Sequence, residues 1–270
     1  MGLYHQQIAV MTIHNPLKGA YISGQGTPIV LLHSSLSSAR QWQPLVKLLE
    51  PHYLVINIDM LSYGNAEKVA DELHYNFDVE INRIKKIINS VAQHQSFHLV
   101  GHSCGGAIAL KLAIEDPEKI LSLSLYEPVA FHLLEQNSGA RVLAENFANQ
   151  VNIDDRYKGA EIFTDFWNQA GFFAALPQKI QDIMARDMPK VSLDFKGLIS
   201  EKYTLSDLSR LTCKVLMMTG EQSPELSRSL ANQIKASLPN VEHQHFPTGH
   251  MGPVTHSGLI HPAIARFIAH

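Results

Sequence analysis

The sequence predicts an α/β fold in which a mostly parallel sheet is flanked by helices. Five short runs rich in Val, Ile and Leu are continuously apolar, as strands covered on both faces are; they lie at Ile29–Leu32, Tyr53–Ile58, Phe97–Val100, Ile120–Tyr126 and Val215–Thr219. Segments with helical spacing of their apolar residues separate these runs. Strands and helices therefore alternate along the chain, which favours parallel strands joined by right-handed crossovers.

Helices are expected in order along the chain, at Gln41–Leu49, Phe77–Ala92, Ala107–Glu115, Glu225–Leu238 and Leu259 to the end. The stretch from Val129 to Asp207 breaks the alternation, because it carries aromatic residues but no strand-like run. We expect it to be helical and inserted between two strands of one sheet, as a cap or lid is. This gives a core at residues 1–128 and 207–270 and a helical cap at 129–206. The alternative is that these helices only pack on the edge of the sheet.

Length and composition limit the classes of protein. The 270 residues are 45% hydrophobic and 17% charged, so the chain can bury a large core without metals or disulfides. The formal charge of -3 gives no basic field, and basic residues do not alternate with aromatics, so no nucleic-acid partner is expected. The two cysteines, Cys104 and Cys213, fall in segments of different predicted character, and we expect both to be reduced.

The fifteen histidines raise the question of a metal site. Their spacing includes neither HExxH nor a Cys/His ligand quartet, so no metal is expected. His243 and His245 alternate along a predicted strand and are expected to face solvent at the edge of the sheet. The first fourteen residues lack the basic stretch and apolar core of a secretory signal, and no apolar run is long enough for a bilayer. We therefore predict a soluble cytoplasmic protein with no membrane partner.

The segment from Phe97 to Ala107 carries the strongest chemical signal. It is a predicted strand, then Gly101-His102-Ser103-Cys104-Gly105, then a predicted helix. A turn that lifts a serine hydroxyl off a strand end is so tight that only small residues fit on both sides of it. The Cys104 N–H then lies at the start of the helix, where free amides favour a developing oxyanion.

We call the turn Gly101–Gly105 between the predicted strand and helix the elbow. With it, the sequence resembles the α/β-hydrolase superfamily over most of its length. Leu31-Leu-His33-Ser34-Ser35 is similar to the family's His-Gly-x oxyanion loop, and Asp59-Met-Leu-Ser62-Tyr63-Gly64 to its Asp-x-x-Gly-x-Gly turn. Pro247-Thr-Gly249-His250-Met251 resembles the turn that carries the catalytic histidine. The resemblance implies an eight-stranded type of sheet, no cofactor, a small-molecule substrate, and an option of homodimers, which are common in the superfamily.

Within this resemblance, Ser103 is the nucleophile and His250 is the general base that accepts its proton. The backbone N–H groups of Ser35 and Cys104 form the oxyanion hole. The Cys104 thiol is a poor rival nucleophile, because the side chain after the serine points away from this hole.

Two histidines near these motifs have supporting roles. His102 is expected to pack in the elbow, and His33 to brace the oxyanion loop.

Two positions depart from the family pattern. Ser34 replaces the glycine after the oxyanion-loop histidine, and Ser62 replaces the first glycine of the Asp-x-x-Gly-x-Gly turn. Serine fits at such positions only if the local φ permits it, so the geometry of the oxyanion loop can differ from the family norm.

The acid that orients His250 is less clearly marked. In the family pattern an Asp follows the strand that is predicted here at Val215–Thr219, but Ser223 occupies that position. A second location in the superfamily follows the preceding strand, where Glu127 stands, so Glu127 is the first choice and Glu221 the reserve. A dyad without an acid is a third option.

The expected activity is acyl transfer on a small to medium apolar carboxylic ester, as in a carboxylesterase. The same residues would also serve a C–C bond hydrolase, a thioesterase, a lactonase or a cofactor-free haloperoxidase. A serine nucleophile disfavours haloalkane dehalogenase and epoxide hydrolase, which in this superfamily use Asp. The missing Asp and the altered oxyanion loop motivate an alternative of another class, a sensor that binds a small ligand without turnover. An assembly role alone fits poorly with an intact serine and histidine.

Overall fold

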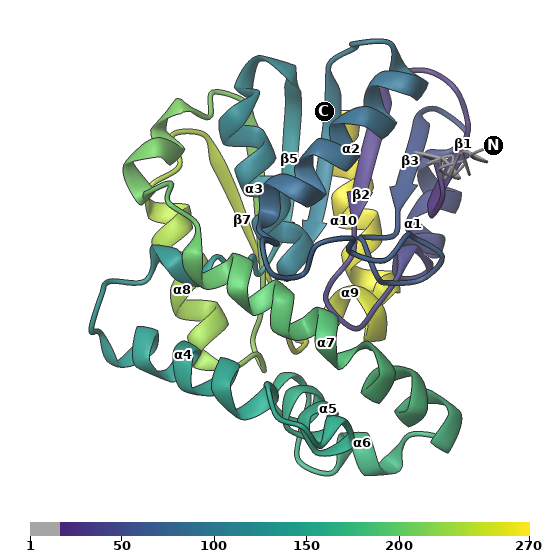
Figure 1. Cartoon of the computed structure of the whole chain (residues 1–270). Coiled ribbons are helices and arrows are strands. Elements are labelled where there is room, and N and C mark those ends of the chain that lie inside the picture. Colours follow the sequence, from purple (N-terminus) through teal and green to yellow (C-terminus); the bar gives the residue numbers. More distant parts are fainter. Residues whose placement is uncertain (1–16) are drawn as a thin grey trace, which may run out of the picture.

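The computed structural model describes residues 17–270, in which seven strands form one sheet (Figure 1). Their order is β1-β3-β2-β4-β5-β6-β7, with β1 antiparallel to β3 and the other pairs parallel. The strands are β1 (Ala20–Ser23), β2 (Pro28–Leu32), β3 (Leu54–Ile58), β4 (Phe97–His102), β5 (Ile120–Tyr126), β6 (Lys214–Gly220) and β7 (Val241–Phe246). The predicted mostly parallel α/β sheet is confirmed.

Among residues 17–270, the count of seven strands differs from the eight-stranded type implied by resemblance. The sequence signal behind the strands is continuous burial, and all five residues of β2 are indeed buried. Strand β1 has no such signal, because its four residues are half-buried or exposed at the edge of the sheet. The number eight came from the family pattern and not from the residues.

Strand β7 is the opposite edge. His243 and His245 are exposed on it, as predicted. Both rings lie within hydrogen-bond distance of the Thr219 hydroxyl, at 2.9 and 2.8 Å.

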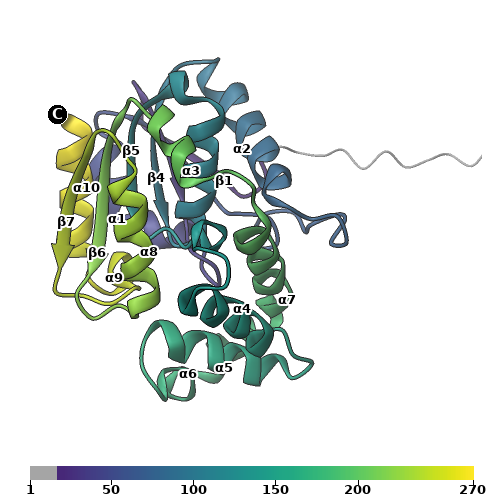
Figure 2. The ribbon, with the colours of Figure 1, turned by 90° about the vertical axis from the view of Figure 1, so that its left-hand side faces the viewer.

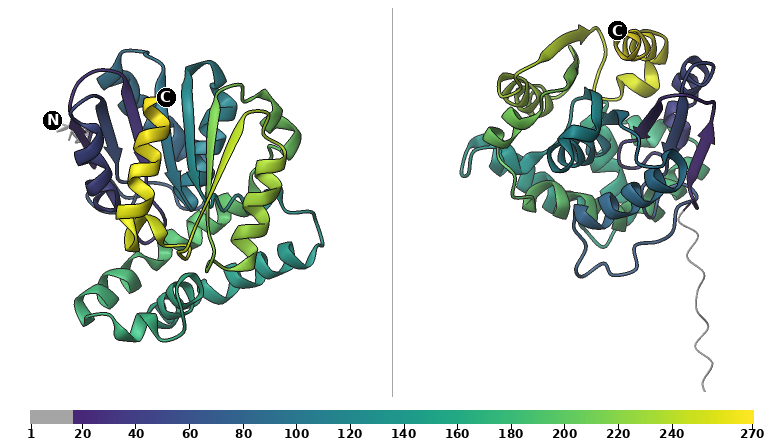
Figure 3. Two further views of the ribbon diagram at one scale, coloured as in Figure 1. Left: turned by 180° about the vertical axis from the view of Figure 1, so that it is seen from behind. Right: turned by 90° about the horizontal axis from the view of Figure 1, so that it is seen from above.

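Helices cover both faces of the sheet (Figures 2 and 3). One face packs against α1 (Gln43–Leu49) and α10 (Ser257–Ala269), where Leu45 and Ile264 meet the strands. Trp42, at the end of the 3-10 turn Ala39–Trp42 before α1, packs in the same cluster. The other face packs against α2 (Phe77–Ala92), α3 (Cys104–Glu115) and α8 (Glu225–Ala236). A short helix, α9 (Gly252–Thr255), precedes α10.

Helix α2 shows why the expected boundaries hold. The Asn76 side chain accepts a hydrogen bond from the Asp78 N–H and so caps the first turn. Apolar residues at helical spacing face the core, among them Ile81, Ile84 and Ile88. The helix ends at Ala92, and the next residue, Gln93, has a left-handed φ of 48°.

The chain between β5 and β6 is helical, as predicted, and its main helices gather at one end of the sheet (Figure 1). They are α4 (Gly139–Val151), α5 (Arg156–Trp167), α6 (Phe172–Ala175) and α7 (Gln178–Ser200). Short 3-10 turns at Phe131–Leu133 and Leu205–Arg210 join them to the strands. The division into a core and a cap at residues 129 and 206 stays a prediction.

Among residues 17–270, no helix combines the length and apolar character that crossing a bilayer requires.

Candidate active site

Ser103 occupies a strained turn between β4 and α3. Its φ of 56° and ψ of -119° are rare for a residue with a side chain. A Cβ at Gly101 would lie 2.6 Å from the Gly105 carbonyl oxygen, and one at Gly105 would lie 2.3 Å from the His33 carbonyl oxygen. The small residues that the sequence places around Ser103 are therefore a steric requirement of this turn.

Three sequence-predicted residues meet at the carboxyl ends of the strands. The Ser103 hydroxyl donates to His250 Nε2 at 2.9 Å, and His250 Nδ1–H donates to a Glu127 carboxylate oxygen at 2.6 Å. Ser103 follows β4 and Glu127 follows β5, and the parallel pairing of His102 with Tyr126 brings the two to the same level. The three side chains are nearly inaccessible, so these bonds lie in a water-poor setting.

Glu127 is held by several donors. One carboxylate oxygen accepts the Gly220 N–H at 2.7 Å, and the other accepts the Ser227 hydroxyl at 3.0 Å. Burial raises the pKa of Glu127, but the hydrogen bonds from His250 Nδ1–H and the Gly220 N–H outweigh it, so the pKa lies below its ordinary value. The carboxylate is therefore ionised and oriented toward the imidazole.

The backbone of Glu127 explains this orientation. Its φ of 42° is left-handed, and its N–H donates to the Met218 carbonyl at 3.1 Å. The chain thus turns sharply as it leaves β5, and the side chain points toward β6 and His250. Glu221, the reserve acid, is exposed on the turn after β6 instead. Ser223, at the usual Asp position, is buried in that turn.

The predicted oxyanion donors come from two elements. Cys104 is the first residue of α3, so its N–H has no acceptor within the helix. Ser35 lies in the buried loop after β2, and its hydroxyl donates to Asp194 at 2.6 Å. Burial raises the pKa of the Cys104 thiol well above its ordinary value, which makes this thiol a poor nucleophile.

The two serines that replace glycines behave differently. Ser34 needs no left-handed φ, and its N–H and hydroxyl both donate to Gln41, at 3.2 and 3.0 Å. Ser62 does adopt a left-handed φ of 64°, and its hydroxyl oxygen accepts the Val69 N–H at 3.0 Å. Of these two serines, only Ser62 therefore adopts a backbone conformation that favours glycine.

His33 braces the loop that carries Ser34 and Ser35, as predicted. Its Nδ1–H donates to the Ser34 carbonyl at 2.7 Å, and its Nε2 accepts the Met60 N–H at 2.9 Å. Burial lowers the pKa of His33, which fits a neutral ring that both donates and accepts.

His102 packs in the elbow, as predicted, and also holds the loop after β7 that carries His250. It donates Nε2–H to the His250 carbonyl at 2.9 Å. Burial and the neighbouring His250 lower the pKa of His102 well below its ordinary value. Tyr126 holds the same loop, because its hydroxyl donates to the Gly249 carbonyl at 2.8 Å.

Trp167 is a site residue to which the sequence assigned no role. Its indole, at the end of α5, stacks on the His250 imidazole with ring centres 4.1 Å apart and an angle of 29° between planes. The aromatic richness of the segment was visible in the sequence, but not the ring that Trp167 would meet. A pocket of about 340 Å³ next to this stack is lined by residues that include Phe172, Gln222 and Met251.

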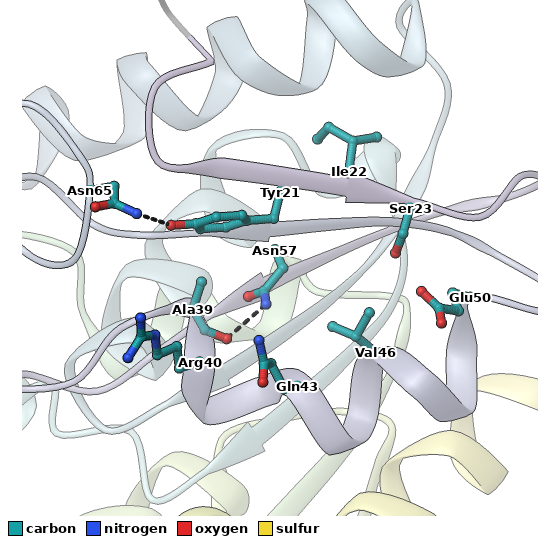
Figure 4. Close-up of a pocket in the computed structure, with 10 residues that line it drawn as sticks. All are labelled: Tyr21, Ile22, Ser23, Ala39, Arg40, Gln43, Val46, Glu50, Asn57 and Asn65. Atoms are coloured by element: carbon teal, nitrogen blue, oxygen red, sulfur yellow. Dashed lines mark hydrogen bonds between the residues drawn. The ribbon is translucent and has the colours of Figure 1, made fainter.

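A second pocket, of about 380 Å³, lies at the β1 edge of the sheet and shares none of these residues (Figure 4). It is lined by Tyr21, Ile22, Ser23, Ala39, Arg40, Gln43, Val46, Glu50, Asn57 and Asn65. In the part of the chain that the structure describes, no group of three or more His, Cys, Asp or Glu side chains is arranged to hold a metal ion.

Comparison with known proteins identifies the family. The model of the alpha/beta hydrolase fold matches residues 27–257. The chain therefore belongs to the α/β-hydrolase fold family, as its resemblance implied. A solved structure, the enol-lactonase from Burkholderia xenovorans LB400, superposes with a TM-score of 0.77 at 15% identity and covers 93% of this chain and 96% of that one. At this identity the match shows the fold alone.

Curated relatives differ in their activities. A fluoroacetate dehalogenase from Burkholderia sp is 26% identical over 116 residues, which are 42% of this chain and 38% of the relative. A 2-hydroxymuconate semialdehyde hydrolase from Pseudomonas sp. (strain CF600) is 36% identical over 106 residues, 38% of this chain and 37% of the relative. A pimeloyl-(acyl-carrier protein) methyl ester esterase from Legionella pneumophila (strain Paris) is 24% identical over 260 residues, 91% of this chain and 96% of the relative.

Proposed function

We propose that this protein is a cofactor-independent serine hydrolase that cleaves a carboxylic ester by acyl transfer. The observation that carries the proposal is the continuous chain of hydrogen bonds from Ser103 through His250 to Glu127. A serine, an imidazole and a buried carboxylate in this order are what an activated hydroxyl nucleophile needs.

The chemistry follows from the positions of the donors and acceptors. Ser103 Oγ attacks the ester carbonyl carbon while its proton passes to His250 Nε2, and Glu127 stabilises the imidazolium. The Ser35 and Cys104 N–H groups hold the oxyanion. When the intermediate collapses, the C–O bond to the alcohol breaks and His250 gives the leaving oxygen its proton. Water then repeats these steps on the acyl-enzyme and releases a carboxylic acid.

A small to medium apolar acyl or alkyl group is the proposed substrate part. The helical segment, which we propose as a cap over residues 129–206, brings a cluster of aromatic rings toward the site; it includes Phe147, Phe163, Phe166, Trp167 and Phe195. A relative that aligns over 91% of this chain is named a methyl ester esterase, which supports an ester over the other bonds. Dehalogenation is not proposed, because Ser103 stands where dehalogenases of this superfamily use Asp.

A C–C bond hydrolase is the second candidate. The 36% identity to a 2-hydroxymuconate semialdehyde hydrolase, over 38% of the chain, favours it.

A panel of p-nitrophenyl esters of graded acyl length tests the first candidate, the ester hydrolase, and measures the size of the pocket. We expect turnover by the wild type and none by Ser103→Ala.

Labelling by a fluorophosphonate probe provides the control. The wild type should be labelled at Ser103, and Ser103→Ala should not. The wild type could instead be folded, unlabelled and inactive, and gain thermal stability from a bound ester. That result would reject the hydrolase proposal and favour a ligand sensor.

A further inference from the structure

A second buried carboxylate, Asp194 of α7, lies beside the oxyanion loop. One of its oxygens accepts both the Ser35 hydroxyl at 2.6 Å and the Tyr63 hydroxyl at 2.7 Å. Asp194 is only 1% exposed, so water does not compete for these bonds. The bond to Ser35 joins residues 159 positions apart in the chain.

Lys190 supplies the countercharge. It lies one turn before Asp194 on α7 and donates to the other Asp194 oxygen. It also reaches Glu80 of α2 at 3.2 Å, and its ammonium lies 5.0 Å from the ring centres of both Tyr63 and Tyr75. Burial lowers the pKa of Lys190, but the charges of Asp194 and Glu80 outweigh this effect and raise it above its ordinary value. The lysine is therefore a permanent cation.

The place of Ser35 makes this cluster relevant to the reaction. Its backbone N–H is the proposed second oxyanion donor, and its hydroxyl is the group that Asp194 holds. An oxyanion donor contributes fully only when its N–H points at the position the oxyanion will occupy. A short bond from the same residue to a fixed acceptor limits how the loop can rotate.

We propose that Asp194 is a positioning residue that orients the Ser35 N–H through the Ser35 hydroxyl. The inference rests on the proposed acyl-transfer function and extends it to a residue of the helical segment. Lys190 makes the arrangement compatible with catalysis, because without a neighbouring cation the Asp194 carboxylate would repel the oxyanion that Ser35 binds.

Two substitutions test the bond from both ends. Ser35→Ala removes the hydroxyl and keeps the backbone N–H, and Asp194→Ala removes the acceptor. We expect each to lower kcat by about 10- to 100-fold, below the cost of losing a whole oxyanion donor, with KM changed less than about twofold. The affinity for a trifluoromethyl ketone, whose adduct carries an oxyanion, should fall in parallel. The double variant should be no slower than Asp194→Ala alone, because both changes break the same bond.

Tyr63→Phe is the matched control. It removes the other hydroxyl from the same Asp194 oxygen without touching Ser35. We expect its kcat to stay within about twofold of wild type even if its thermal stability falls. Equal losses of kcat in Tyr63→Phe and Ser35→Ala would show general loosening of the cluster and overturn the inference.

The outcomes separate this inference from the proposed function. An active wild type with fully active, folded Ser35→Ala and Asp194→Ala variants would overturn the positioning role alone. An inactive wild type would overturn the hydrolase itself. If Asp194→Ala does not fold, Ser35→Ala decides, because it leaves the Lys190–Asp194 pair intact.

Discussion

Two buried carboxylates, Glu127 and Asp194, bind residues of the proposed active site, His250 and Ser35 respectively, and their charges are balanced in different ways. Glu127 receives neutral donors from Gly220 and Ser227 together with the imidazole of His250. Asp194 also receives hydroxyl donors but is paired with the ammonium of Lys190. Both side chains are almost completely buried, so the contrast lies in the partners and not in the solvent.

The contrast matches the charge that each carboxylate has to meet. On the Glu127 side, a positive charge appears on His250 during the proposed reaction. An ionised carboxylate that has no other cation as a partner can stabilise this charge. On the Asp194 side, a negative charge appears near Ser35, and a carboxylate there needs a fixed cation to cancel its repulsion. A carboxylate with a permanent partner therefore suits the oxyanion side, and one without suits the imidazole side.

Removing the charge at Glu127 should have the largest effect. We expect Glu127→Gln to lower kcat by about 10³- to 10⁴-fold, because the amide neither stabilises the imidazolium nor enforces the required tautomer. Steady-state kinetics on the best ester measures this loss. Glu221→Gln is the control and should change kcat little, since Glu221 is exposed. A fully active Glu127→Gln variant would show that Glu127 is not the acid of the triad, and the contrast between Glu127 and Asp194 would no longer hold.

Removing the cation at Lys190 should have the next largest effect, on stability. Lys190→Met leaves Asp194 and Glu80 buried without their countercharge, which should lower the free energy of unfolding by about 3–5 kcal/mol. Urea denaturation measures it. Lys158→Met, in α5, removes an ion pair with Glu161 in which both side chains are exposed, and should lower the free energy of unfolding far less. Equal losses in the two variants would mean that Lys190 is not needed as a buried countercharge.

The smallest expected effect is a loss of folding stability at low pH that comes from His261 and from neither carboxylate. Burial lowers the pKa of His261, beside Trp42 on the other face of the sheet, to about 4. The unfolded chain therefore takes up this proton first as the pH falls, and stability is lost between about pH 6.5 and pH 4. We expect His261→Leu to flatten this slope by up to about 1.4 kcal/mol per pH unit. Unfolding curves at several pH values measure it, and an unchanged slope would contradict a neutral His261.

Much of the fold could be predicted because its signals are local. The α2 range Phe77–Ala92 and the β5 range Ile120–Tyr126 are predicted to the residue. Burial of one helix face leaves a periodic pattern in the sequence, and burial of most of a strand leaves a short apolar run. The half-exposed strand β1 leaves no such pattern and was missed.

The sequence by itself determined the elbow, because only small residues fit around Ser103, and it predicted the pairing with His250. The tertiary structure decided which carboxylate reaches that histidine. It favoured Glu127 over Glu221 through one left-handed φ at the end of β5.

Two further contacts are also visible only in the tertiary structure. Trp167 stacks on His250, and Asp194 accepts the hydrogen bond of the Ser35 hydroxyl. Periodicity shows that a residue is buried, but the partner of a buried polar group depends on how distant elements pack. These two contacts cross between the helical segment and the strand ends, and no local pattern encodes them.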